Sequence, residues 1–142
     1  MEYITLNNGT KAPLAGIGTF LLEPKDAENS VYEALKMGYP MIDTANAYMN
    51  EKAVGRGVRR SGVRREDVYL VTKLWPSVYH DADKAIDETL ARLDVDCIDL
   101  LFLHQPAGDY IAALDRNAPY YVATPEALSG YLNFAPDFND QP

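Results

Sequence analysis

Four polar residues of the kinds that move protons follow short apolar runs of the chain. Asp43, Lys73 and His104 each close such a run, and Tyr48 lies a few residues beyond the first of them. A lysine ammonium beside a phenol favours the phenolate and makes a tyrosine a stronger acid, while histidine and aspartate can orient a neighbouring group. Brought together, these side chains could give a proton to an oxygen atom on which negative charge develops during a reaction.

Each of the four residues also has a simpler interpretation when it is taken alone. Tyr48 could be a surface aromatic residue, and Lys73 could extend its ammonium group into water from a strand end. Asp43 could cap the helix that follows it, and His104 could be a hydrogen-bonded structural histidine. Core packing does not explain why polar groups recur at the ends of successive apolar runs. The four residues taken together therefore favour a shared functional site.

The sequence predicts alternating strands and helices, and these elements would position the four residues. An Asn-Gly turn between two short runs predicts an N-terminal β-hairpin at residues 3–13. Apolar runs then predict buried strands, with residues at helical spacing between them. The expected strands are 14–20, 39–44, 68–72 and 98–104, and the expected helices are 22–37, 50–61 and 81–93. This alternation predicts parallel strands with crossover helices, whose carboxyl ends build a site at one edge.

The composition narrows the functional classes. The 142 residues are 47% hydrophobic and 24% charged, which suits one domain with a core. The formal net charge of -8 argues against nucleic-acid binding, and the arginine pairs at 59–60 and 64–65 are interpreted as exposed. No apolar run approaches the ~20 residues of a membrane helix, and the polar N-terminus lacks a signal pattern. A cytoplasmic protein that binds no membrane is therefore expected.

The remaining candidate residues receive structural interpretations. The single cysteine, Cys97, lies in an apolar run and is expected to be buried rather than nucleophilic. His80 begins a polar helical segment and is expected at the surface. Because the two histidines are far apart in sequence and lack clustered carboxylates or thiols, no metal site is predicted.

Four segments in a fixed order resemble the sequence motifs of the aldo-keto reductase family. The segment 38–55, which contains Asp43 and Tyr48, is similar to the family's first signature. The segment 16–19 precedes it, and the segments 71–75 and 103–106 follow it. The resemblance covers about residues 1–113, and four motifs in the family's order are far more specific than any one alone.

This resemblance implies part of a (β/α)8, or TIM, barrel. The expected fold class is α/β, with about four βα units after the N-terminal hairpin, because a complete barrel takes about 250 residues. Residues 1–113 are expected to form the N-terminal half of the barrel. Residues 114–142 are expected to form a C-terminal tail with one short helix beginning near Thr124. The join near Leu114 is interpreted as an internal truncation.

The resemblance also implies a reaction, namely reduction of an aldehyde, a ketone or a sugar-derived keto acid by hydride transfer from NADPH. In the family, the residue matching Tyr48 is the general acid. The residue matching Lys73 makes that tyrosine more acidic, the one matching Asp43 holds the lysine, and the one matching His104 orients the carbonyl oxygen.

Further residues are implied in binding. Thr19 and Asp43 match positions that contact the cofactor. Phe20 and Trp75 match positions that line the substrate pocket, with core packing as an equal alternative for both. The resemblance implies a small-molecule carbonyl substrate, and the loops of this fold set which one the pocket accepts.

Most of the family's cofactor-binding segments have no match in this sequence. One alternative is therefore a catalytically inactive half barrel, either a deletion product or a self-associating interaction module. A half barrel exposes two sheet edges, which are ready sites for strand pairing, so a homodimer that completes the barrel is the expected assembly. A weaker alternative is cofactor-independent isomerisation by Tyr48 and His104.

Overall fold

The N-terminal hairpin forms as its Asn-Gly turn predicts. The computed structural model describes residues 1–6 and 8–116. Strands β1 (Tyr3–Thr5) and β2 (Lys11–Pro13) pair in antiparallel fashion. Gly9 adopts a φ of 85°, the left-handed conformation that tight turns use and that glycine adopts without strain.

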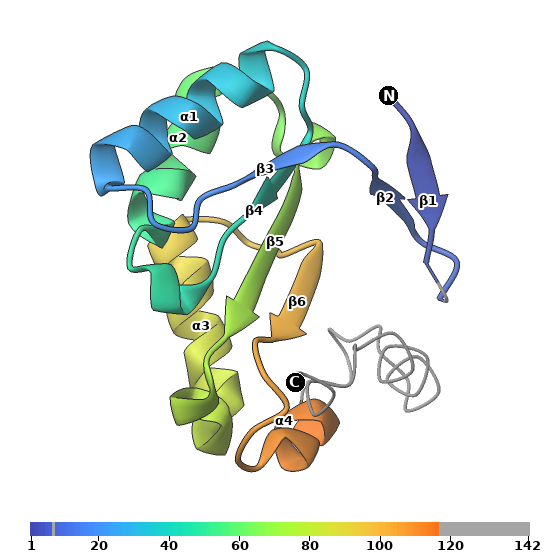
Figure 1. The fold of residues 1–142 in the computed structure, drawn as a ribbon, viewed down its shortest axis with the longest axis vertical. Coiled ribbons are helices and arrows are strands. Elements are labelled where there is room, and N and C mark those ends of the chain that lie inside the picture. The colour runs from blue at the N-terminus through green and yellow to red at the C-terminus, as the bar shows by residue number, and fades with distance from the viewer. Residues whose placement is uncertain (7, 117–142) are drawn as a thin grey trace, which may run out of the picture.

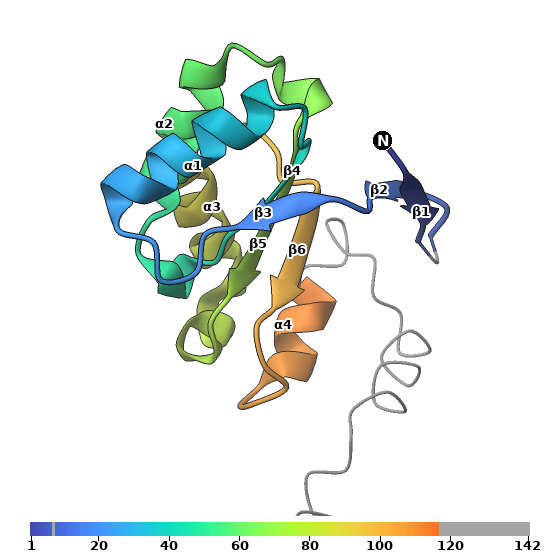
Figure 2. The same cartoon turned by 45° about the horizontal axis from the view of Figure 1, so that its top comes forward.

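The rest of the described chain alternates strands and helices as predicted, with one further helix, Tyr110–Arg116, that the prediction did not include. The elements are β3 (Gly16–Gly18), α1 (Pro24–Lys36), β4 (Met41–Asp43), α2 (Glu51–Ser61), β5 (Tyr69–Leu74), α3 (Ala82–Leu93), β6 (Leu100–Leu103) and α4 (Tyr110–Arg116). The sheet has the order β3-β4-β5-β6, and its neighbouring strands are parallel. Helices α1, α2 and α3 lie on one side of the sheet, and the hairpin lies apart from them (Figure 1; Figure 2). The α/β class is confirmed, and this is the arrangement of βα units in part of a (β/α)8 barrel.

Alternation along the strands gives the sheet two different faces. On β5, Leu70, Thr72 and Leu74 contact the helix layer and are 0% exposed. Lys73, which lies between them in sequence, turns to the opposite face. Ile42 of β4 packs with Leu70 in the apolar core under α1 and α2. This burial fixes the strand register, because a shift by one residue would turn the apolar positions away from the helices.

Two glycines let α2 approach its neighbours closely. A Cβ atom at Gly55 would overlap the carbonyl group of Leu93 in α3, and one at Gly57 would overlap the carbonyl oxygen of Glu28 in α1. Any larger residue would therefore push the helices apart. The close packing holds the start of α2, with Glu51, directly behind β5.

The first and last strands of the sheet differ from the predictions. The run 14–20 is predicted to be a buried strand, but only β3 pairs with β4, and its residues are partly or largely exposed. Among the described residues β3 has a neighbour on one side only, which explains this exposure. At the other edge, β6 begins at Leu100. The preceding residue, Asp99, uses its side chain to accept a hydrogen bond of 2.8 Å from the Leu70 amide.

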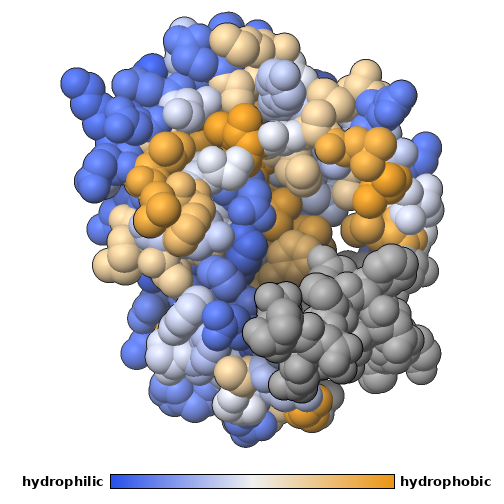
Figure 3. All heavy atoms as spheres, in the orientation of Figure 1, coloured by the Kyte–Doolittle hydropathy of each residue, from blue (hydrophilic) through white to orange (hydrophobic). Residues whose placement is uncertain are grey.

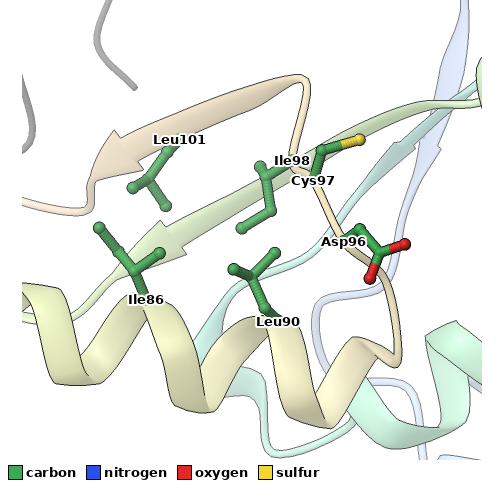
Figure 4. Close-up of a pocket in the computed structure, with 6 residues that line it drawn as sticks. All are labelled: Ile86, Leu90, Asp96, Cys97, Ile98 and Leu101. Carbon is green, nitrogen blue, oxygen red and sulfur yellow. The ribbon is translucent and has the colours of Figure 1, made fainter. Parts of the chain in front are cut away.

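The prediction that Cys97 is buried is wrong. Cys97 is exposed in the turn between α3 and β6, because the strand begins later than the apolar run suggests. Its sulfur points away from Ile86 and Leu90, whose side chains line a small apolar pocket between α3 and β6 (Figure 4). His80 is exposed, as predicted.

The predictions for the C-terminal tail lie outside the described residues, including the short helix expected near Thr124. Within residues 1–6 and 8–116, no helix has the length and apolar character that a membrane crossing needs. The same part of the chain contains no group of three or more histidine, cysteine, aspartate or glutamate side chains suited to a metal ion.

Candidate active site

A lysine near the carboxyl end of the sheet gathers the predicted residues around its ammonium group. Lys73 Nζ donates hydrogen bonds to Asp43 Oδ1 at 2.6 Å, to the Thr44 carbonyl oxygen at 2.9 Å and to Tyr48 Oη at 3.3 Å. These three bonds use all the donors of an ammonium group. The side chain of Lys73 is 16% exposed and that of Asp43 is 34% exposed, so the ion pair is partly shielded from water.

The parallel pairing of β4 and β5 explains how these residues meet. Asp43 ends β4, and Lys73 lies near the end of the adjacent strand on the same face of the sheet. Tyr48 follows in a 3₁₀ turn after β4. The alternative that Asp43 caps a helix is excluded, because Asn50 occupies the N-cap position of α2.

His104 lies just beyond β6 and faces the same group of residues. Its amide donates a hydrogen bond of 2.9 Å to the Leu74 carbonyl oxygen, which continues the pairing of β5 with β6. The imidazole meets two aromatic rings edge to face, with ring centroids 5.8 Å from Tyr48 and 4.9 Å from Trp75. The structure therefore brings all four predicted site residues to one end of the sheet.

The surroundings of His104 favour its neutral form. Burial lowers the pKa of His104 from its usual value, and the positive charge of Lys73 lowers it further, while Asp43 acts in the opposite direction. The Nδ1 atom is buried and has no hydrogen-bond partner among the described residues. A neutral imidazole carries one N–H group, so the ring can donate a single hydrogen bond.

Phe20 and Trp75 stand at the rim of the site. The Phe20 ring lies 5.0 Å from the Tyr48 ring and is 62% exposed. Trp75 contacts His104, is 37% exposed, and is held by a hydrogen bond of 3.0 Å from its amide to Asn46 Oδ1. These exposed fractions exclude the alternative that either residue belongs to the core.

Thr19 and Asp43 differ in what they could offer to a cofactor. Thr19 is 0% exposed, and its hydroxyl lies 3.0 Å from the Thr44 hydroxyl and 3.2 Å from the Asp43 carbonyl oxygen. The hydroxyl of Thr19 therefore already has hydrogen-bond partners within the protein and does not face a space that a cofactor could enter. Asp43 keeps part of its carboxylate exposed on the open face, which fits hydrogen bonding to sugar hydroxyl groups.

The described residues fit the reacting end of a nicotinamide cofactor better than its phosphate end. The reacting end needs a proton donor beside an open face, which the Lys73 and Tyr48 pair provides. The six arginines between residues 56 and 92 each form an ion pair with a carboxylate of this chain. Phosphate groups would have to be bound by other residues.

Three buried polar residues next to the site, Asn50, Glu51 and Thr72, were not identified from the sequence. Asn50 donates its side-chain amide to two carbonyl oxygens of the segment after β3, at 2.8 and 3.1 Å. Glu51 accepts a hydrogen bond of 2.8 Å from Thr72 Oγ1. One signal could have revealed Glu51. It shares a helical face with the apolar residues Val54 and Val58, where a carboxylate needs a buried partner.

Comparison with known proteins identifies the family. The sequence model of the protein family described as "Aldo/keto reductase family" matches residues 14–129 of this chain. Glycerol 2-dehydrogenase (NADP(+)) of Saccharomyces cerevisiae is 40% identical over 128 residues, which cover 90% of this chain and 38% of that protein. The chain belongs to the aldo/keto reductase family and spans less than half the length of the curated relatives it matches.

Solved structures of family members share the fold. An aldo/keto reductase from Brucella melitensis matches with a TM-score of 0.76 and 34% identity, covering 93% of this chain and 48% of that chain. A Bombyx mori aldo-keto reductase in complex with NADP matches with a TM-score of 0.77 and 26% identity, covering 86% of this chain and 48% of that one. The expected partial (β/α)8 barrel is confirmed.

Proposed function

We propose that the protein is an oxidoreductase that reduces the carbonyl group of an aldehyde or ketone with NADPH. The observation that carries this proposal is the position of the Lys73 ammonium, 3.3 Å from a phenol and 2.6 Å from a carboxylate at the end of a parallel sheet. The names of the yeast relative and the Bombyx mori complex, both of which include NADP, support the choice of cofactor.

Tyr48 is the general acid in this proposal. When bound, NADPH would supply the hydride that forms the new C–H bond at the carbonyl carbon. Tyr48 gives the proton of its Oη to the resulting alkoxide, which forms the O–H bond and leaves a phenolate. The Lys73 ammonium, 3.3 Å away, stabilises that phenolate until water returns the proton.

Asp43 and His104 position the reacting groups. Asp43 keeps Lys73 charged and directed toward Tyr48 through the 2.6 Å ion pair. His104, in its neutral form, donates a hydrogen bond to the substrate oxygen and stabilises the charge that develops on it.

Phe20 and Trp75 are the aromatic walls of the substrate pocket in this proposal. Their open rim suits small polar carbonyl compounds, including sugar-derived keto acids, and the glycerol named for the yeast relative supports substrates of this size. Asp43 would contact the cofactor directly, while Thr19 would support that contact from within through its bond to the Asp43 carbonyl oxygen.

A fluorescence titration with NADPH tests this proposal. Trp75 is the only tryptophan of the chain and lies in the site, so its emission reports on binding there. Saturable quenching is expected, and Asp43→Asn is expected to weaken it. No saturable change up to millimolar NADPH would contradict the proposal and favour a catalytically inactive half barrel.

We further propose that two copies of this chain associate through their open sheet edges. Among the described residues, β3 and β6 each have a neighbouring strand on one side only. Large apolar side chains near these edges are exposed, including Met37 at 72%, Tyr39 at 41% and Phe102 at 38%. Apolar surface is visible across the middle and right of the molecule, where the sheet and hairpin lie (Figure 3). Exposed strand edges of this kind favour pairing with another chain.

Sedimentation velocity over a wide concentration range tests the association. The expected result is a species of about twice the mass of one chain that dissociates on dilution, and Phe102→Lys is expected to shift the equilibrium toward the monomer. A single monomeric species at all concentrations would contradict this part of the proposal without affecting the NADPH titration.

A further inference from the structure

Behind the site, on the helix side of the sheet, a buried carboxylate contacts the residue next to Lys73. Glu51, at the start of α2, is 2% exposed. Its Oε1 accepts a hydrogen bond of 2.8 Å from Thr72 Oγ1, and its Oε2 accepts one of 2.6 Å from Arg92 Nε. Arg92 also donates to Thr89 Oγ1 at 2.9 Å. Glu51 thus links α2 to β5 and to α3.

Stability alone is a poor explanation for this carboxylate. Burial raises the pKa of Glu51 above its usual value, although the hydrogen bonds from Arg92 and Thr72 act in the opposite direction. Desolvation therefore outweighs the attraction of the partners. A well-packed apolar residue in the place of a buried ion pair is often as stable or more so, so a buried pair points to a role in geometry.

The contacts of Glu51 lead directly to the lysine of the site. Thr72 and Lys73 are consecutive residues of β5 whose side chains lie on opposite faces of the sheet. Holding the Thr72 side chain therefore holds the backbone from which Lys73 extends. The neighbouring residue, Asn50, acts on the second lysine partner. It accepts a hydrogen bond of 3.2 Å from the hydroxyl of Thr44, whose carbonyl oxygen accepts one of 2.9 Å from Lys73 Nζ.

We propose that Glu51 is a positioning residue for the site. By holding Thr72 from the helix side, it fixes the direction in which Lys73 extends toward Asp43 and Tyr48. The catalytic consequence of this inference rests on the proposed function, but the geometry at Lys73 can be measured without any turnover.

Nuclear magnetic resonance of the lysine side chain measures that geometry. The ¹⁵Nζ and ¹³Cε signals of Lys73, assigned by their loss in Lys73→Met, report on the bonding of the ammonium group. Thr72→Val removes the hydroxyl that Glu51 binds at nearly constant volume. We expect the Lys73 signals to move toward those of free lysine and the ammonium protons to exchange faster with water.

Thr89→Val is the matched control. Thr89 is also 0% exposed and also belongs to the Glu51–Arg92 group, but its hydroxyl accepts a hydrogen bond from Arg92 of α3 rather than bonding Glu51 as the Thr72 hydroxyl of β5 does. The same chemical change there is expected to leave the Lys73 signals in place. Unchanged signals in folded Thr72→Val, or equal changes in both variants, would overturn the proposal.

Changes at Glu51 give a second and independent test. Glu51→Gln can still donate to Thr72 and accept from Arg92, so the Lys73 signals are expected to persist. Glu51→Asp keeps the charge but is one methylene shorter, and it is expected to reproduce the effect of Thr72→Val. Thr72→Ser keeps the hydroxyl, so its Lys73 signals are expected to match those of the unaltered protein rather than those of Thr72→Val. A shift of the Lys73 signals toward those of free lysine in Glu51→Gln but not in Glu51→Asp would show that the charge of Glu51 matters and its reach does not. That result would also overturn the proposal.

Turnover separates this inference from the proposed function. If the protein reduces carbonyl compounds, Thr72→Val is expected to lower kcat by roughly 10-fold with little change in KM, because a misdirected Lys73 weakens only the proton transfer. Absence of turnover in the unaltered protein would count against the proposed function and leave the result at Lys73 standing.

Discussion

On β5, neighbouring residues face two different environments on the two sides of the sheet. Leu70, Thr72 and Leu74 face the helices, are 0% exposed, and belong to the packed layer. Lys73 faces the open side and reaches a carboxylate and a phenol. Because successive side chains point to opposite faces, a lysine can sit in an open site although both of its neighbours in sequence are buried.

This comparison separates the residues that stabilise the fold from those proposed to carry the chemistry. The covered face is almost entirely apolar, and its few polar groups, such as Thr72 and Glu51, are bonded to one another. The open face keeps Asp43 and Lys73 partly exposed, so that a ligand can reach them. Substitutions at Asp43 and Lys73 on the open face should therefore mainly lower activity, and substitutions of apolar residues on the covered face should mainly lower stability.

The largest expected effect is the loss of activity in Lys73→Met. Removing the ammonium leaves the phenolate of Tyr48 without its neighbouring charge, so kcat should fall by roughly 100-fold or more. The free energy of unfolding should fall by less than the ~3 kcal/mol expected for breaking a fully buried pair, because the Asp43 side chain that remains is 34% exposed and can be hydrated. Steady-state kinetics and denaturant unfolding measure both quantities. A large loss of stability would contradict the division between the two faces.

On the covered face, the expected effect is on stability. Leu70→Ala removes a side chain from the core and should lower the free energy of unfolding by about 2–5 kcal/mol. Phe102→Ala, at a position that is 38% exposed, should cost at least about 1 kcal/mol less, because fewer of its contacts are lost. Urea unfolding compares the two variants, and equal losses would show that the open face is packed as tightly as the covered one.

The smallest expected effect is the pH dependence that His104 gives to stability. Its pKa in the folded chain is lower than the usual value of 6.5, so the unfolded chain takes up this proton first as the pH falls. The contribution of His104 to stability is therefore complete above pH 6.5 and is lost as the pH drops below it. Proton NMR titration in a His80→Asn background, where His104 is the only histidine, measures the pKa. A pKa of His104 above 6.5 in the folded chain would mean that protonation stabilises the fold, which contradicts the predicted pH dependence.

Much of the fold could be predicted from sequence because its signals are local. The Asn-Gly turn places the hairpin, and apolar runs separated by helical patterns place the parallel strands. Residues that close neighbouring parallel strands come together wherever those strands pair, so Asp43 and Lys73 could be placed in one site without a structure.

The features that were missed depend on contacts between distant parts of the chain. Burial of residues 14–20 depends on how many neighbours β3 has, which no local pattern encodes. Cys97 is exposed because β6 starts after Asp99, whose carboxylate binds an amide of β5. The bond from Thr72 to Glu51 crosses 21 residues of sequence, and only the packing of α2 behind the sheet brings the two together.

The most direct test of the central claim is NADPH oxidation, followed at 340 nm with a small aldehyde as substrate, in the unaltered protein and in Tyr48→Phe. The variant removes one oxygen atom from the site and leaves the Lys73 ion pair with Asp43 in place. We predict substrate-dependent oxidation by the unaltered protein and a fall in kcat of roughly 10²- to 10⁴-fold in the variant, with unchanged unfolding. Equal rates in the two proteins would contradict the assignment of Tyr48 as the general acid.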